Sequence, residues 1–325
     1  MVRNFKEPGR EKPLSSAEID RLLFQLKRDR QGPPGMDSGR MSDGEGGKNA
    51  AVLIDDAVRQ VEDIFAGVRL GNGVGITAIK TDILPAIRTL AEIPGVPHFF
   101  HLLDRKDRYT SSHAVCVSMI AGMIGRWLGI GGALMEDLLL GSILHDIGKI
   151  KIPDAILSKP GKLTLSEYEE MKLHSVYGYE MVRDLEDVSP KAALIVLQHH
   201  EREDGRGYPL GLKGREIEQL AKITAIADVF HAMSSARIYH DALPFYQVMR
   251  KMKDGAFGSF EPGFMLIFIQ KLMNSLAGSM VRLTDQSEGR ILLVHPYDPL
   301  SALVQTEDRL IDLRYSRELQ IERIL

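Results

Sequence analysis

The stretch Ile143-Leu-His-Asp-Ile-Gly-Lys149 decides the fold of this chain. It places an imidazole and a carboxylate at adjacent positions, His145 and Asp146, and a lysine one helical turn later, at Lys149. Residues 136–144 are mostly apolar, so they predict a helix that buries the pair. Burying an ionised carboxylate beside a histidine is costly unless its charge is compensated, most simply by a metal ion. A metal ion with a cation beside it suits attack on a phosphate.

A histidine–aspartate pair within one helix is by itself usually structural or solvated, and the rest of the chain decides against that interpretation. Further histidines and one aspartate recur at intervals of 25 to 32 residues, each long enough for one helix and one loop. Helices packed side by side can direct such side chains into one central pocket. Five of the ten histidines belong to the set, more than chance clustering would give. The candidate ligands are His113, His145, Asp146, His174, His199, His200 and Asp228. A capping-box pattern at Thr164 and Glu167 predicts the start of the helix that carries His174.

The same residues carry a resemblance to a known family. His145-Asp146 resembles the signature of the HD phosphohydrolase superfamily. The run His199-His-Glu-Arg-Glu-Asp-Gly-Arg-Gly-Tyr-Pro209 resembles the second signature of its HD-GYP family, which has eight fixed positions. Residues 211–214 and 223–228 extend the similarity, which covers 98–278. Known members of this family are cyclic di-GMP phosphodiesterases. The residues themselves argue for a polynuclear metal site acting on phosphates, and only the resemblance points to cyclic di-GMP.

The resemblance implies a mechanism. The seven candidates would hold two metal ions, with Asp146 bridging them. A water activated by both ions would attack the phosphorus, while Lys149 and Arg237 stabilise charge on the phosphoryl oxygens. The product would be linear pGpG, or GMP after a second cut. Imidazole and carboxylate ligands suit iron, manganese or zinc, and the resemblance favours iron or manganese.

Four neighbouring residues have open or subsidiary roles. Tyr208 could stack on a guanine base or hydrogen-bond a phosphate, and alternatively Gly-Tyr-Pro is only a rigid turn in the pocket wall. Asp204 is expected to pin this loop rather than bind metal. His231 stands where the family commonly has aspartate; it either supports a ligand or is partly exposed, and we do not assign it as a ligand. Some members carry a glutamate for a third metal where this chain has Tyr109, and a phenol of pKa about 10 is a poor ligand, so we expect a binuclear site.

Two alternative functions stay open. The protein could bind cyclic di-GMP as a receptor without cutting it, although the complete ligand set and Lys149 argue against this. It could also be an HD hydrolase of another nucleotide. The Gly-Tyr-Pro loop argues against a guanosine polyphosphate, but not against a hybrid cyclic dinucleotide.

Composition excludes several classes of protein. The net charge of −3 gives no electrostatic case for binding a nucleic acid polymer or an anionic membrane. The single cysteine, Cys116, excludes an internal disulfide framework and fits a reducing compartment, and its apolar neighbours predict that it is buried filler. Residues 1–10 lack the apolar core of a signal peptide, and no apolar stretch is long and uncharged enough to span a membrane. We therefore expect a cytoplasmic protein.

The predicted fold is mainly α: an HD-type helical bundle with an N-terminal helical extension and a small C-terminal β appendage. Within the polar segment, residues 16–27 predict one short helix, and Pro85 predicts a kink or an earlier end in the second helix of the extension. The two extension helices would pack together, either within one chain or between two chains of a homodimer. The expected segments are a largely disordered 1–50, the extension 51–97, the HD-GYP domain 98–278 and the appendage 279–325, in which Asp298-Pro299 is expected as a turn between short strands.

Overall fold

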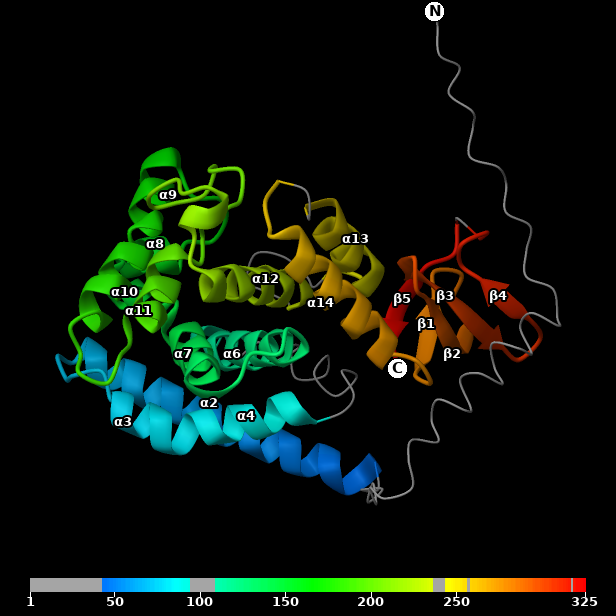
Figure 1. Cartoon of the computed structure of the whole chain (residues 1–325), viewed down its shortest axis with the longest axis horizontal. Helices are drawn as coiled ribbons and strands as arrows, with labels where there is room; N and C mark the ends of the chain where they lie inside the picture. The colour runs from blue at the N-terminus through cyan, green and yellow to red at the C-terminus, as the bar shows by residue number, and fades with distance from the viewer. Residues whose placement is uncertain (1–42, 94–108, 236–242, 256–257, 317) are drawn as a thin grey trace, which may run out of the picture. The chain divides into compact units, whose positions relative to one another are not determined.

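The computed structural model describes residues 43–93, 109–235, 243–255, 258–316 and 318–325. Helices make up most of this part of the chain, and one antiparallel sheet follows the last helix (Figure 1). The predicted fold class is therefore confirmed. The short helix expected at 16–27 and the candidate ligand contact Arg237 lie outside the described residues. Residues 46–325 form one unit, and the domain boundaries expected within it stay a prediction.

The N-terminal extension starts with α2 (Asp43–Arg69), which begins well before the expected boundary at residue 51. Its buried face carries Ile54, Val58, Val61 and Phe65, at the helical spacing read from the sequence. Ala50 and Ala57 are buried on the same helix, but the polar residues of its first turns gave no sign that it starts at Asp43.

The second helix of the extension contains a π-helical turn. It consists of α3 (Ile76–Ala78), a π-helical segment (Ile79–Ile83) and α4 (Leu84–Glu92), with Pro85 at the start of α4. Proline has no amide hydrogen, and its ring collides with the carbonyl four residues before it in an α-helix. A π-turn changes this local bonding pattern and lets the helix continue, so the helix does not end before Pro85, and the kink expected there stays a prediction.

The central bundle surrounds the helix that leads to the His-Asp pair. Helix α6 packs against α4, α7 and α12, and α11 packs against α7, α10 and α12. Cys116 is buried on α6, as expected for an apolar filler. The elements of the bundle are α6 (Tyr109–Trp127), α7 (Gly132–Leu144), a 3-10 helix (Ile147–Lys151), α8 (Asp154–Leu157), α9 (Leu165–Lys172), α10 (His174–Val182), α11 (Pro190–Gln198), a second 3-10 helix (Gly214–Glu216) and α12 (Gln219–Ser234).

Two amphipathic helices complete the helical part, α13 (Phe245–Gly255) and α14 (Pro262–Ser275). Helix α13 contacts strands β5 and β3 of the sheet, and helix α14 contacts strands β2 and β3. The strands are β1 (Met280–Leu283), β2 (Glu288–His295), β3 (Asp298–Thr306), β4 (Leu310–Asp312) and β5 (Ile321–Ile324). Their order is β4-β3-β2-β1-β5, with every pair antiparallel.

The sheet differs from expectation at two places. Asp298 and Pro299, expected as a turn, begin β3, because His295 pairs directly with Asp298 and leaves only two residues for the connection. Strand β5 was not predicted, since its burial pattern spans only four residues and gives too short an alternation to recognise.

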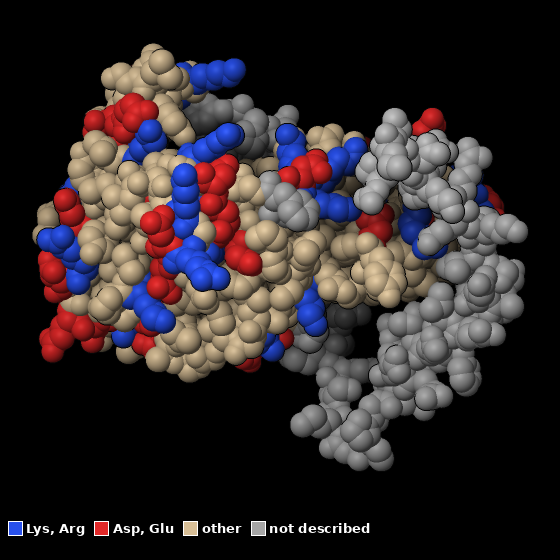
Figure 2. Space-filling model, turned by 45° about the horizontal axis from the view of Figure 1, so that its top comes forward, with Lys and Arg blue, Asp and Glu red and all other residues tan. Residues whose placement is uncertain are grey.

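Two surface properties bear on partners. On the face seen in Figure 2, acidic and basic side chains are interspersed, in line with the small net charge. Within the described ranges, every helix is too short or too polar to cross a membrane.

Candidate metal centre

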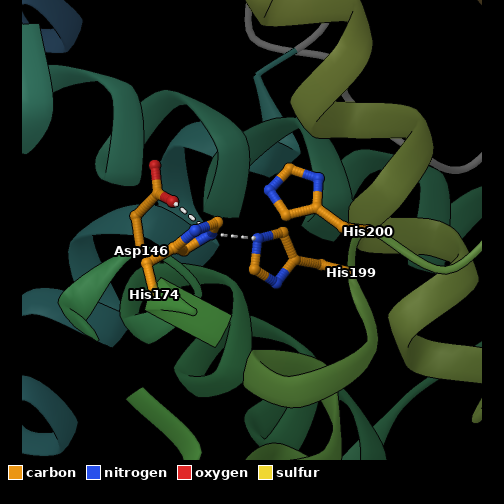
Figure 3. Close-up of side chains that lie close together, drawn as sticks. All are labelled: Asp146, His174, His199 and His200. Atoms are coloured by element: carbon orange, nitrogen blue, oxygen red, sulfur yellow. Dashed lines mark hydrogen bonds and ion pairs between the residues drawn. The ribbon is translucent and has the colours of Figure 1, made fainter. Parts of the chain in front are cut away.

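Six of the seven predicted ligands meet in two groups that share one carboxylate. His113, His145 and Asp146 form the first group, and Asp146 with His174, His199 and His200 forms the second. The Nε2 atoms of His113 and His145 are 3.3 Å apart, as are those of His174 and His199. Figure 3 shows the second group, in which the His174 ring lies between the Asp146 carboxylate and the His199 ring. Such convergence of side chains from separate helices is what a metal centre requires.

Asp146 lies between the two groups. Its Oδ2 is 3.2 Å from Nε2 of His145 and 3.6 Å from Nε2 of His113, and its Oδ1 is 3.3 Å from Nε2 of His174. Asp228, on α12, places its Oδ1 3.1 Å from Nε2 of His113. Each carboxylate oxygen of Asp146 therefore faces a different set of imidazoles.

Backbone carbonyls fix how three of the imidazoles point. His145, His174 and His199 each place Nδ1 within 2.7 to 2.9 Å of the carbonyl oxygen three residues earlier. A carbonyl only accepts, so Nδ1 carries the hydrogen and donates it, which leaves the lone pair of Nε2 directed into the centre. The accepting carbonyls belong to Ser142, Met171 and Val196.

This arrangement depends on helix ends, and here two predictions are wrong. Helix α7 ends at Leu144, so the pair expected within it lies in the turn that follows. The reason is Gly148, where a Cβ atom would lie 1.9 Å from the carbonyl oxygen of His174 and 2.4 Å from the amide of Gly178. The chain must leave the helix to pack this closely on α10. His174 likewise is not on the helix opened by the capping box of Thr164 and Glu167, which is present, but begins α10.

His113 is oriented by another histidine. His113 Nδ1 lies 2.8 Å from Nδ1 of His231, whose Nε2 lies 3.2 Å from Oγ of Ser235. If His113 offers Nε2 to the centre, its Nδ1–H donates to His231. His231 is buried, so the alternative that it is partly exposed is wrong. His231 therefore supports the ligand His113 and is not a member of either ligand group.

Replacing His231 by alanine is expected to weaken metal binding about 10- to 100-fold, because His113 loses the partner that holds its ring and its tautomer. Titration of metal-free protein with the ion measures this. Glutamine, which keeps an acceptor, should restore part of the affinity, and Ser235→Ala should have a smaller effect. Equal affinity in His231→Ala and wild type would show that the contact does not position His113.

The electrostatics of the centre favour a cation. Burial lowers the pKa of His174 to about 4 and that of His199 and His200 well below the ordinary value, so these rings are neutral and able to donate lone pairs. Burial alone would raise the pKa of Asp146, but Lys149 and His145 outweigh it and hold that pKa well below its usual range. The carboxylate is therefore ionised, and the rings of His174, His199 and His200 beside it are neutral.

Two acceptor atoms that face each other, one on Asp146 and one on His174, show whether a metal ion fits this centre. Oδ1 of Asp146 is buried and accepts no hydrogen bond from the described residues. It lies 3.3 Å from Nε2 of His174, which carries no hydrogen because Nδ1 does. Two acceptors at this separation repel unless a cation lies between them. The donors are nitrogen and oxygen atoms, which suit divalent transition metals. The residues present fit a divalent metal.

The loop after α11 is held by Glu201, a motif residue that sequence reasoning left without a role. Its buried carboxylate accepts hydrogen bonds from the amides of Leu210 (2.7 Å) and Leu212 (2.9 Å), across the Gly-Tyr-Pro segment. Asp204 accepts one from the amide of Arg206, as a loop-pinning residue should. The Tyr208 ring stacks on His200, with centroids 4.5 Å apart. Burial raises the pKa of Tyr208, so its hydroxyl stays protonated and can donate.

Replacing Glu201 by alanine is expected to destabilise the protein by about 2 kcal/mol or more, because two backbone amides lose charge-assisted hydrogen bonds to its buried carboxylate. Urea denaturation followed by circular dichroism measures the change. The matched control is Glu186→Ala, an exposed carboxylate. An unchanged midpoint in Glu201→Ala would show that other contacts hold the loop.

A cleft of about 690 Å³ opens onto the centre. Asp146, Lys149, His174, His200 and Tyr208 all line it. Nζ of Lys149 lies 2.5 Å from Oδ2 of Asp146, with its side chain 27% exposed, so the ammonium is at the floor of the cleft and reaches its solvent. Of the predicted substrate contacts, Lys149 and Tyr208 therefore meet in one cleft, and Arg237 lies outside the described residues. Tyr109 is the first residue of α6, and its side chain is likewise outside them.

The fold and the site together define a helical bundle with a buried histidine–aspartate metal centre, and comparison with known proteins gives its family. The HD domain family matches residues 97–262, just over half of the chain. The chain belongs to the HD-domain family, in its HD-GYP group. HD domains bind divalent metal ions, in agreement with the donor set found here.

Curated relatives and a solved structure match as well. The cyclic di-GMP phosphodiesterase PA4108 of Pseudomonas aeruginosa is 33% identical over 264 residues, which are 81% of this chain and 63% of that protein. The 3'3'-cGAMP-specific phosphodiesterase 3 of Vibrio cholerae is 30% identical and matches 71% of this chain and 52% of its own. The chain thus spans between half and two thirds of these relatives' lengths. Bd1817, an HD-GYP-type protein of Bdellovibrio bacteriovorus, has the same fold at 17% identity, with a TM-score of 0.56 over 78% of this chain and 80% of that one.

Proposed function

We propose that this protein hydrolyses the phosphodiester bonds of cyclic di-GMP to linear pGpG, and to GMP in a second cut. The observation that carries the proposal is Asp146, whose two oxygens face two separate groups of imidazoles across a cleft floor. A carboxylate placed in this way suits a bridge between two metal ions. Relatives named as cyclic di-GMP phosphodiesterases supply the substrate class.

The roles of the residues follow from their positions. When bound, divalent ions supply Lewis acidity, which makes water acidic and neutralises charge on a phosphate. The seven ligands would hold two such ions, and iron or manganese suits their mixture of imidazole and carboxylate. Lys149 lies at the cleft floor, where its ammonium stabilises negative charge on the phosphoryl oxygens. Tyr208 would contact the substrate from the cleft wall, and we retain Arg237 as a further contact.

Two further expectations go with this proposal. The extension helices would form a homodimer interface, and the substrate would be the cyclic dinucleotide rather than a nucleic acid polymer. Neither changes the chemistry of the centre.

A second candidate function is hydrolysis of 3'3'-cGAMP, because one relative with 30% identity is named for that substrate. It would use the same centre and the same cleft. The two candidates differ only in the base that the cleft selects. A receptor that binds without cutting is disfavoured, because ligands and Lys149 are assembled as hydrolysis requires.

The test is a substrate panel read by mass spectrometry. Metal-loaded protein is incubated with cyclic di-GMP, 3'3'-cGAMP, cyclic di-AMP and a guanosine polyphosphate. Fastest conversion of cyclic di-GMP to pGpG or GMP is the expected result. Faster cleavage of 3'3'-cGAMP would favour the second candidate, and binding of cyclic di-GMP without any product would support the receptor alternative.

A further inference from the structure

The N-terminal extension contributes one wall of the cleft that leads to the metal centre. Besides residues of the HD domain, the cleft is lined by four residues of α2, which we call the α2 stripe: Glu62, Phe65, Ala66 and Arg69. They are spaced three, four and seven residues apart, so they follow one face of the helix over two turns. The metal ligands lie at the floor of the cleft. The α2 stripe lies in the segment before residue 97, where the match to the HD domain family begins.

The stripe combines three chemical groups in one row. Glu62 is a half-buried carboxylate, the ring of Phe65 is buried with 7% exposure, and the guanidinium of Arg69 is exposed. Arg69 Nη1 lies 3.8 Å from Oδ1 of Asp154, with the side chains 53% and 82% exposed. An ion pair this long and this exposed contributes little to stability, so it leaves Arg69 available to a ligand. Phe65 accounts for the packing of the α2 stripe, and packing alone does not explain the charged side chains beside it.

The chemistry of these groups matches a guanine base. Guanine presents two adjacent N–H donors on its Watson–Crick edge, which one carboxylate can accept together. Its O6 and N7 atoms accept from an arginine. Adenine presents an acceptor where guanine has the N1–H group, so a carboxylate there repels it. A cyclic dinucleotide carries two bases, and the metal centre addresses only a phosphate, so the cleft walls must provide the base contacts.

We infer that the α2 stripe binds a guanine base of the substrate, with Glu62 selecting guanine over adenine and Arg69 contacting the base or its phosphate. The inference rests on the proposed function for the identity of the substrate. The N-terminal extension is then part of the substrate-binding site. Glu62 distinguishes cyclic di-GMP from a substrate that has adenine at that position.

The test compares Glu62→Gln and Arg69→Gln with the wild type on cyclic di-GMP and on bis(p-nitrophenyl) phosphate, a diester without a base. Asp63→Asn is the matched control, since this carboxylate is exposed on the same helix and does not line the cleft. In Glu62→Gln, kcat/KM for cyclic di-GMP should fall about 10- to 100-fold relative to the aryl diester, mainly through KM, because a hydrogen bond to a charged group is lost. The ratio of kcat/KM for cyclic di-GMP to kcat/KM for 3'3'-cGAMP should also be smaller in Glu62→Gln than in the wild type.

Two outcomes would overturn the inference. One is a wild-type kcat/KM for both substrates in both stripe variants. The other is an equal loss on both substrates, which a purely structural role of α2 would give. Asp63→Asn should match the wild type.

Failure of the proposed function would look different. In that case the wild type cuts the aryl diester but no cyclic dinucleotide. Inhibition of aryl diester hydrolysis by GMP and AMP then decides the inference. Preferential inhibition by GMP that weakens in Glu62→Gln supports guanine binding by the stripe, and equal inhibition of wild type and variant overturns it.

Discussion

Asp146→Asn is expected to reduce turnover of cyclic di-GMP about a thousandfold or more. The substitution keeps the shape of the side chain but removes the charge that both groups of imidazoles share. The amide would be a weaker metal ligand than the carboxylate and forms no ion pair with Lys149, so the ions and the lysine would lose their common anchor. Initial rates followed by separation of pGpG, together with metal content per chain, measure both losses.

The control for this prediction is Asp184→Asn, which removes the charge of an exposed carboxylate that is not one of the candidate metal ligands. Metal-free Asp146→Asn should still unfold cooperatively, because the helices around it are held by their apolar contacts. Wild-type turnover with wild-type metal content in Asp146→Asn would remove Asp146 from the centre of the mechanism.

Gly148→Ala is expected to destabilise the protein by about 3 kcal/mol or more. The added Cβ would lie 1.9 Å from the carbonyl oxygen of His174, and backbone atoms on both sides cannot rotate away as a side chain could. The turn that carries the His-Asp pair must then move off α10, which also separates Asp146 from His174. Urea denaturation gives the free energy of unfolding, and metal titration gives the loss of affinity.

Gly73→Ala is the matched control, because a Cβ there meets nothing within 4 Å. It should leave both the denaturation midpoint and the metal affinity close to those of the wild type. A wild-type midpoint for Gly148→Ala would mean that the turn can move away from α10 without cost, and the close packing would not explain why α7 ends at Leu144.

Much of the fold and of the centre was predictable because both leave periodic signals. Apolar residues at helical spacing gave the bundle and the extension, and the recurrence of histidines at one-helix intervals gave the set of side chains that the structure brings together. These features depend on local sequence and on the simple rule that adjacent helices share a core.

What could not be predicted depends on contacts between residues far apart in the chain. The end of α7 is set by Gly148 against His174, and the role of His231 by its contact with His113, 118 residues away. The same holds for the α2 stripe, because the sequence shows a polar face on a helix but not the cleft that it lines. Glu201 was visible as a motif residue, and only the loop geometry reveals which amides it holds.

The most direct test of the central claim is a titration of metal-free protein with iron(II) or manganese(II) under anaerobic conditions, with cyclic di-GMP turnover measured at each step. The expected result is that turnover rises with bound metal and reaches its plateau at two ions per chain, with pGpG or GMP as product. Cyclic di-GMP hydrolysis by protein shown to be free of metal would contradict the account. So would fully metallated protein that binds cyclic di-GMP and releases no product.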